Sequence, residues 1–89
     1  MKAVISVIGK DRRGIIYHIS KILYENDINI LDISQTIMQE IFTMVAMVDI
    51  SKSSVDFETL KGLLSECAET NVLQIHVQHE DIFSSMHNI

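Results

Sequence analysis

Residues 2–23 read KAVISVIGKDRRGIIYHISKIL and predict a strand that leads directly into a helix. Over residues 2–8 both alternating faces are largely apolar, which is typical of a central strand. The segment Gly9–Gly14 interrupts that alternation. Asp11 is the expected N-cap, because its carboxylate can accept from the free N–H groups of a first helical turn. The apolar residues beyond it recur at helical spacing and predict one buried helix face: Ile15, Ile16, Ile19, Ile22 and Leu23.

Two more strands are predicted after this helix. Asn26–Asp27 ends the helix, and Asn26 is the residue expected to take the left-handed conformation. Residues 28–38 and 41–50 are both rich in apolar and β-branched side chains, which favours strands. Because only Gln39–Glu40 separates them, they are expected to form an antiparallel hairpin.

The strand at residues 28–38 is expected at an edge of the sheet. Its polar stretch Asp32–Thr36 obscures the alternation and indicates a bulge. Its apolar side chains are assigned in pairs to opposite faces: Ile28 and Ile30 to one face, Leu31 and Ile33 to the other. Exposed apolar edges invite pairing with another chain, and a two-fold arrangement is the commonest closed solution. We therefore expect a homodimer.

The C-terminal half predicts a second helix and a last strand. Ser53–Asp56 has the S-x-x-D spacing of a capping box at a helix start. The expected buried face of this helix comprises Phe57, Leu60, Leu64, Cys67 and Ala68. Residues 72–79 alternate between apolar and polar side chains, which is typical of an edge strand with one wet face. Beyond them, Ile82, Phe83 and Met86 predict a short C-terminal helix.

The order strand, helix, strand, strand, helix, strand predicts an α+β fold of the ferredoxin-like kind. Four antiparallel strands are expected in the order 4-1-3-2, with both helices on one face of the sheet. At 89 residues the chain is expected to be one domain, with a core at residues 2–79 and a tail at residues 80–89. The fold alone does not give a function, because it hosts many unrelated tasks.

Composition argues against several classes of protein. The formal net charge is −5 with seven Lys and Arg, which argues against a direct contact with nucleic acid, since phosphate neutralisation dominates that binding. No apolar run approaches the about 20 residues of a membrane-spanning helix. The residues after Met1 lack a signal-peptide pattern, and the lone Cys67 allows no internal disulfide. We therefore expect a cytoplasmic protein without membrane contact.

The loop Gly9–Gly14 is the most informative segment for function. It meets a helix N-terminus, where free N–H groups and the positive end of the helix dipole favour a negative group such as a carboxylate. Lys10, Arg12 and Arg13 add positive charge. A solvated turn with a capping Asp11 explains the same residues, and the spacing alone does not distinguish these two interpretations.

No catalytic residue, metal site or cofactor site is predicted. His76 and His79 would point to opposite faces of their strand, so they cannot chelate one metal as a simple pair, and all four histidines are expected at the surface. No pair of carboxylates stands out for acid–base chemistry. An acylphosphatase-like hydrolase using Arg12 or Arg13 is a remote alternative, because that family's local pattern around the arginine is missing.

Three stretches resemble ACT domains, which are small regulatory modules attached to enzymes of amino-acid metabolism such as aspartokinase and phosphoglycerate dehydrogenase. They are KAVISVIGKDRRGII at residues 2–16, HISKIL at residues 18–23 and NDINILDISQT at residues 26–36. The resemblance covers about residues 2–79, so that the chain reads as a single ACT domain. It is closest to a bacterial and archaeal family of stand-alone ACT proteins of about this length. That family is also similar to the modules of the glycine-cleavage transcriptional repressor.

This resemblance implies an amino-acid sensor built as a homodimer. The second strands and first helices of two copies would meet to form an eight-stranded sheet, with a small amino acid bound at the seam. The residues carried over for the ligand's carboxylate lie in or next to the first loop: Gly9, Asp11, Arg12, Arg13, Gly14 and Ile15. Asn29, which opens the second strand, would contact the ligand's amino group from the other subunit.

Two alternatives stay open within this resemblance. Arg13 stands where the commoner ACT loop has proline, which leaves the rigidity of the loop and the choice of ligand open. Some ACT domains bind no ligand and only dimerise, so a structural interaction module is the second interpretation. In the sensor interpretation, the protein acts on a partner protein that the sequence does not identify.

Overall fold

The computed structural model describes residues 1–80 of the chain. Six elements follow one another: β1 (Lys2–Gly9), α1 (Arg12–Glu25), β2 (Asn29–Met38), β3 (Ile41–Asp49), α2 (Phe57–Asn71) and β4 (Gln74–His79). Each predicted strand and helix of this part is present, and apart from the start of α2 the ends lie within about two residues of the prediction. The short helix predicted from Ile82 onward lies outside the described residues.

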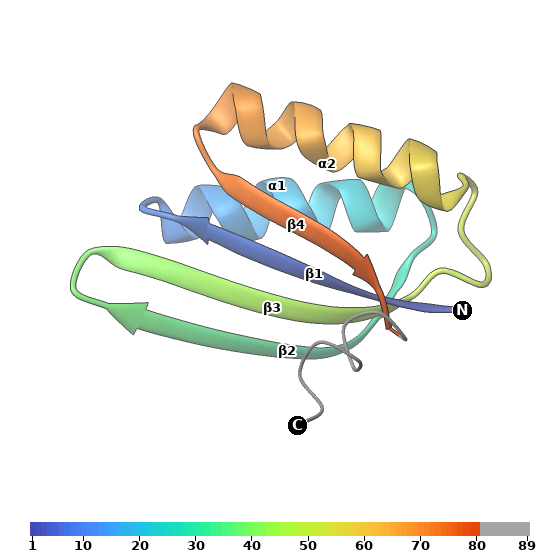
Figure 1. Cartoon of the computed structure of the whole chain (residues 1–89), viewed down its shortest axis with the longest axis horizontal. Coiled ribbons are helices and arrows are strands. Elements are labelled where there is room, and N and C mark those ends of the chain that lie inside the picture. The colour runs from blue at the N-terminus through green and yellow to red at the C-terminus, as the bar shows by residue number, and fades with distance from the viewer. Residues whose placement is uncertain (81–89) are drawn as a thin grey trace.

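The strands form one antiparallel sheet in the order β2-β3-β1-β4. Both helices cover the same face of this sheet, and β2 and β4 are its edges (Figure 1). The predicted ferredoxin-like fold and its strand order are therefore confirmed. The loop between β1 and α1 lies at the same end of the sheet as the turn between β2 and β3, whereas the N-terminus lies at the opposite end (Figure 1).

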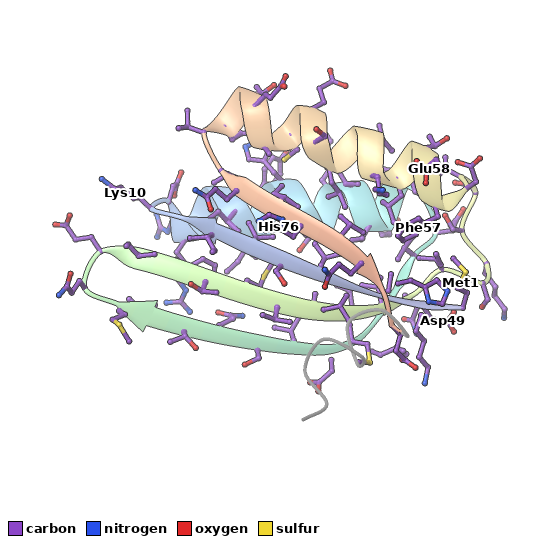
Figure 2. The ribbon with its side chains drawn as sticks, in the orientation of Figure 1. Met1, Lys10, Asp49, Phe57, Glu58 and His76 are labelled. Atoms are coloured by element: carbon purple, nitrogen blue, oxygen red, sulfur yellow. The ribbon has the colours of Figure 1, made fainter. Side chains whose placement is uncertain are left out.

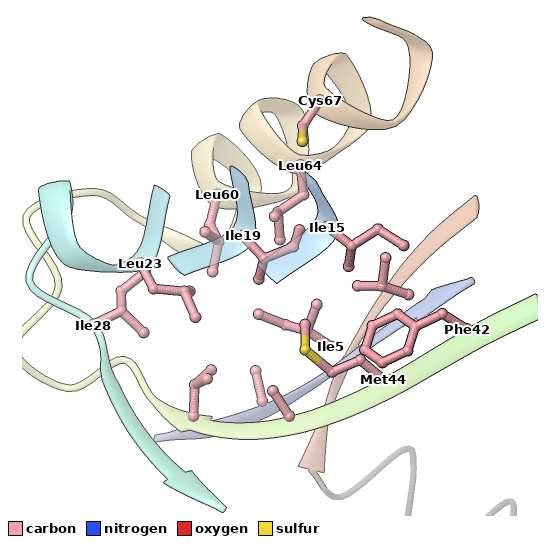
Figure 3. Packing of buried hydrophobic residues seen from close by; sticks show 14 residues of the cluster. Ile5, Ile15, Ile19, Leu23, Ile28, Phe42, Met44, Leu60, Leu64 and Cys67 are labelled. Atoms are coloured by element: carbon pink, nitrogen blue, oxygen red, sulfur yellow. The ribbon is translucent and has the colours of Figure 1, made fainter. Parts of the chain in front are cut away.

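The core lies between the sheet and the two helices. The central strands contribute Ile5, Phe42 and Met44, which are at most 2% exposed (Figure 3). From the helices, six of the ten side chains predicted on the buried faces are buried: Ile15, Ile19 and Leu23 of α1, and Leu60, Leu64 and Cys67 of α2. The other four, Ile16, Ile22, Phe57 and Ala68, are only partly buried. Burial of these side chains against β1 and β3 supplies the main stabilisation of the fold.

A bulge in β2 changes which of its side chains share a face. The pairing of β2 with β3 shifts by one residue between Ile30 and Asp32, so that Leu31 is the extra residue. Ile30 then lies opposite Val48, and Ile33 lies opposite Ala46. Since Val48 and Ala46 are both buried under the helices, Ile30 and Ile33 share the helix-covered face. The predicted bulge is confirmed, but the assignment of these two isoleucines to opposite faces is wrong.

Two predicted helix boundaries, the start of α2 and the end of α1, need correction. The N-cap of α2 is Asp56, whose Oδ1 accepts from the Thr59 N–H at 2.8 Å. Ser53 is not the cap, because its hydroxyl is bonded locally to Val55. At the end of α1 it is Asp27, with φ of 57°, that adopts the left-handed conformation. The Asn26 side chain instead donates to the Ile22 carbonyl at 2.7 Å and extends the helix by one cap residue.

Candidate functional site

Asp11 organises the first turn of α1, as predicted. Its Oδ1 accepts from the Gly14 N–H at 3.1 Å, and its carbonyl oxygen accepts from the Ile15 N–H at 2.9 Å. Two of the N–H groups in this loop are therefore engaged within the protein. A first helical turn leaves its leading N–H groups without an intrahelical acceptor, so Arg12 and Arg13 present the N–H groups that remain.

The two glycines of the loop have different structural roles. A Cβ atom on Gly14 would lie 2.5 Å from Asp11 Oδ2, so with any other residue at position 14 the Asp11 carboxylate would have to shift from the place it takes over the helix start. A Cβ atom on Gly9 would lie 2.5 Å from Leu73 Cδ2 and 2.9 Å from Ile15 Cδ1. Gly9 therefore allows the end of β1 to pack tightly against α1 and the segment before β4. Neither glycine has a positive φ, so close contact rather than backbone conformation requires them.

Two cations of the loop, Lys10 and Arg12, border a hollow at the far end of β2. Lys10, Arg12 and Arg13 are all exposed. The Arg12 guanidinium lies 6.0 Å from the centre of the Phe42 ring, a cation–π contact that holds its side chain toward the hairpin. A hollow of about 430 Å³, here called the loop hollow, is lined by Lys10, Arg12, Ile37, Gln39, Glu40 and Phe42.

Asn29 lies at the other end of the sheet from this loop. It opens β2 and pairs with Asp49, whose side chain lies near the N-terminal amino group, whereas Lys10 is at the opposite end (Figure 2). A second hollow of about 470 Å³, here called the turn hollow, is lined by Tyr24, Asp27, Ile28, Asn29 and Lys52. One copy of the chain thus brings together the predicted residues from Gly9 to Ile15 but not Asn29.

Asp49 is one of the charged residues at the Asn29 end of the sheet. The Ser51 N–H donates to Asp49 Oδ1 at 2.9 Å, and this backbone hydrogen bond holds the pKa of the Asp49 carboxyl below its usual range. The N-terminal amino group lies 3.8 Å from the same oxygen and lowers that pKa further. Asp49 is therefore charged at neutral pH and has partners within its own protomer.

The β2 edge presents apolar side chains to solvent. Ile30 and Ile33 are each 38% exposed, Leu31 is 44% exposed and Ile37 is 58% exposed. Ile28 is the exception, because it is buried at the entry to the strand with 7% exposure. The prediction that β2 is an apolar edge strand is confirmed for the other residues. Such an edge offers both unpaired backbone groups and an uncovered apolar surface.

Histidine, cysteine and acidic residues do not gather into a metal site in residues 1–80, where no group of three or more lies close enough to hold an ion. His76 is exposed, and His18 and His79 are partly exposed beside neighbouring rings, so none of these three is buried in the core. His87 lies outside the described residues. In the same part of the chain, no helix is long and apolar enough to cross a membrane.

The sequence pattern that defines the ACT domain family matches residues 2–78. The chain therefore belongs to the ACT domain family of regulatory, ligand-binding modules, which commonly bind small ligands such as amino acids. A UPF0237 protein from Methanocaldococcus jannaschii is 57% identical over 88 residues, which are 99% of this chain and 98% of that relative. Within the ACT domain family, this chain is a member of UPF0237, a group of small bacterial and archaeal proteins.

Solved structures agree with this assignment. An ACT domain protein from Streptococcus pneumoniae is 41% identical, superposes with a TM-score of 0.79 and covers 93% of both chains. A structure described as a glycine cleavage system transcriptional repressor is 20% identical, with a TM-score of 0.75 over 89% of this chain and 47% of that one. At that identity the likeness shows the fold alone. The resemblance drawn from the sequence is confirmed by these comparisons.

Sequence reasoning missed most residues of the two hollows. Tyr24, Asp27 and Lys52 share the turn hollow with Asn29, and Glu40 shares the loop hollow with Arg12. The sequence carries only a weak indication that these residues belong to a site. Tyr24 lies off the apolar stripe of its helix, and Asp27 follows the helix end, where a polar residue is ordinary.

Proposed function

We propose that this protein is a regulatory module that senses a small amino acid at the seam between two copies and acts on a partner protein. The observation that carries the proposal is the match to the ACT domain family over residues 2–78. The geometry of the first loop supports it. Arg12 and Arg13 present unengaged N–H groups at a helix N-terminus, and both carry a positive side chain there.

A two-fold axis perpendicular to the sheet, just outside the free edge of β2 and level with the middle of that strand, builds the proposed dimer. It pairs β2 with its copy in antiparallel fashion and keeps the helices of both copies on one face. Because the axis reverses the ends of the strand, the start of β2 in one copy meets the far end of β2 in the other. The first loop of one protomer then faces Asn29 of its partner. This arrangement explains why one copy alone separates the loop from Asn29.

The β2 edge provides a driving force for this pairing. The side chains that become covered are Ile30, Leu31, Ile33 and Ile37, all of them partly exposed in one copy. Removing apolar surface from water stabilises the dimer by about 25 cal/mol for each Å² buried. Antiparallel pairing also satisfies the free backbone groups of an edge strand.

In the proposed complex the ligand's carboxylate accepts from the N–H groups of Arg12 and Arg13, since those of Gly14 and Ile15 already have acceptors. Asp11 acts as the N-cap that fixes this turn. The side-chain amide oxygen of Asn29 from the other copy accepts from the ligand's ammonium group.

Calorimetric titration of the full chain with each of the twenty amino acids tests the proposal, together with light scattering. We expect a mass near twice the monomer value of 10.1 kDa and saturable heat at sub-millimolar concentration for at least one amino acid. The absence of binding below millimolar for all twenty would refute the sensor function. A monomer at micromolar concentration would refute the dimeric site.

A second candidate function is a structural dimerisation module that binds no amino acid. It is favoured by one observation, namely that the Asp11 cap already engages the N–H groups of Gly14 and Ile15. The same two measurements separate the candidates. A dimer by light scattering that gives no heat with any amino acid supports the structural module.

A further inference from the structure

A third hollow lies between the first loop and the segment that joins α2 to β4. It has a volume of about 460 Å³ and is here called the α2–β4 hollow. All of its lining residues come from β1, the first loop, β3, the end of α2 and the start of β4. Because β4 is the edge of the sheet opposite to β2, this hollow is separate from the seam at which the amino acid is proposed to bind.

Aliphatic side chains form most of the walls of the α2–β4 hollow. Ile8 is 36% exposed, Ile41 is 47% exposed and Val72 is 89% exposed, whereas Leu73 is partly buried. Met38, which pairs with Ile41 across the hairpin and is 71% exposed, continues this apolar surface. Exposed apolar side chains that gather around one depression are typical of a binding surface.

Val72 occupies its place in this wall at a conformational cost. It ends α2 in the left-handed conformation, with φ of 55°, where glycine is the usual residue and a β-branched side chain is unfavourable. Its side chain is almost fully exposed and so gains little from packing within its own protomer. A strained backbone of this kind supports a function for the side chain that it presents.

The α2–β4 hollow is formally neutral. Among the residues that line it, Lys10 and Asp11 are the charged ones, and the Asp11 carboxylate is already engaged as the cap of α1. Asn71 and Gln74 add side-chain amides, of which that of Asn71 donates to the Cys67 carbonyl at 3.0 Å. Amides pair with peptide groups, and a charged occupant would gain no net counter-charge. The hollow therefore favours an uncharged aliphatic group attached to a peptide backbone.

We propose that the α2–β4 hollow is the site at which this protein docks its partner, and that it accepts an uncharged aliphatic side chain, such as leucine, from a segment of that partner. The inference rests on the proposed function for the existence of a partner, and it adds where and by what chemistry the partner binds. The position suits this role. Leu73 packs so tightly against the end of β1 that a Cβ atom on Gly9 would lie 2.5 Å from Leu73 Cδ2. The wall of the hollow thus adjoins the loop that would hold the amino acid.

A titration followed by nuclear magnetic resonance tests the site on the isotope-labelled full chain. The probe is N-acetyl-leucine methylamide, a neutral stand-in for a leucine within a peptide. We expect saturable shifts of the amide signals of Gly9, Leu73 and Gln74, with a dissociation constant on the order of millimolar. N-acetylglycine methylamide, which lacks the side chain, should bind at least about tenfold more weakly. The amide signals of Asn29 and Lys52, at the turn hollow, should not shift.

Val72→Gly removes one wall of the hollow without endangering the fold, because glycine suits the left-handed conformation. We expect this variant to bind N-acetyl-leucine methylamide at least about threefold more weakly than the wild-type chain, since one apolar contact is lost. The matched control is Tyr17→Ala, which removes a side chain that is 59% exposed on α1 and does not line the hollow. Its affinity for the probe should equal that of the wild-type chain.

Three results would overturn the docking site. The first is the absence of saturable shifts at Gly9, Leu73 and Gln74, or an unchanged affinity in Val72→Gly. The second is an equal affinity of free leucine at the same amides, which would assign the hollow to a free amino acid. The third is a fall in the mass of Val72→Gly by light scattering, which would assign the hollow to a contact between copies. The proposed function fails on different evidence, namely the calorimetry and the light scattering of the unmodified chain.

Discussion

Asp11 and Gly14 fit together at the start of α1: the carboxylate accepts from the Gly14 N–H at 3.1 Å, and a Cβ atom at residue 14 would lie only 2.5 Å from that carboxylate. The N-cap and the glycine are therefore one structural unit. The loop that would hold a ligand is built around this unit, so the order of its first turn depends on two residues three positions apart.

This unit predicts a sign change in a double-mutant cycle. Gly14→Ala in the wild-type chain should lower the free energy of unfolding by about 1 kcal/mol or more, because the new methyl group displaces the capping carboxylate. In an Asp11→Ala background the same substitution should raise it by about 0.5–1 kcal/mol, since alanine is the better helix former. Urea unfolding followed by circular dichroism measures both values.

Gly62 is the matched control for that cycle. It lies in α2 with no atom within 4 Å of a built Cβ, so Gly62→Ala should stabilise the chain by about 0.5–1 kcal/mol in either background. An equal effect of Gly14→Ala with and without Asp11 would show that the carboxylate and residue 14 are independent, against the geometry described above.

Stability should depend on pH through the Asp56 cap. Hydrogen bonds from the Thr59 side chain and backbone N–H hold the pKa of Asp56 below the usual 3.8, so this carboxylate is a stronger acid in the folded chain than in the unfolded chain. The contribution of the ionised Asp56 carboxylate to the free energy of unfolding is therefore fully present above pH 3.8. It is lost as the pH falls through the lower pKa that this carboxyl has in the folded chain. Asp56→Asn should flatten this part of the acid limb in urea midpoints measured from pH 6 to pH 2, whereas Glu69→Gln on the exposed surface of α2 should leave it unchanged.

Sequence pattern predicted the fold well because burial and alternation are local signals. The apolar spacing in α1 picked out Ile15, Ile19 and Leu23, and each is buried. It predicted less well where competing polar groups decide a boundary, as at Ser53, whose hydroxyl turns back to Val55. Alternation also fails where a strand has an extra residue. The bulge in β2 moves every later side chain of that strand to the opposite face from the one that simple alternation predicts.

For the candidate site, sequence reasoning identified one half of a two-part arrangement. The loop is contiguous in sequence and therefore visible as a motif. The turn hollow joins Tyr24, Asn29 and Lys52, which come from three different segments of the chain. No spacing rule connects them, because their proximity is a product of the tertiary fold, and the pairing with the loop would be a product of symmetry.

Val72 should be a site where glycine stabilises the chain. It ends α2 in the left-handed conformation with φ of 55°, and its side chain is 89% exposed. A β-branched residue in that conformation costs about 1–2 kcal/mol, and exposed valine recovers little through packing. Val72→Gly should therefore raise the free energy of unfolding by about 1 kcal/mol in urea titrations. Val72→Ala keeps the Cβ atom and should therefore raise the free energy of unfolding much less than Val72→Gly. If both variants raise it equally, the effect comes from removing the β-branched methyl groups and not from the left-handed backbone conformation.

The β2 edge gives the most direct test of the seam. Ile33 lies at the middle of β2 and is 38% exposed on its helix-covered side, so in the two-fold pairing its side chain meets the middle of the partner's β2. Ile33→Lys places a charge from each copy at the axis, where the two charges repel and both lose water. The mass measured by light scattering at micromolar concentration should fall toward 10.1 kDa, with unchanged circular dichroism. His76→Lys, which adds the same side chain to the exposed face of the other edge strand, should leave the dimer intact. If His76→Lys dissociates the dimer and Ile33→Lys does not, the copies pair through β4, and the loop of one protomer does not face Asn29 of the other.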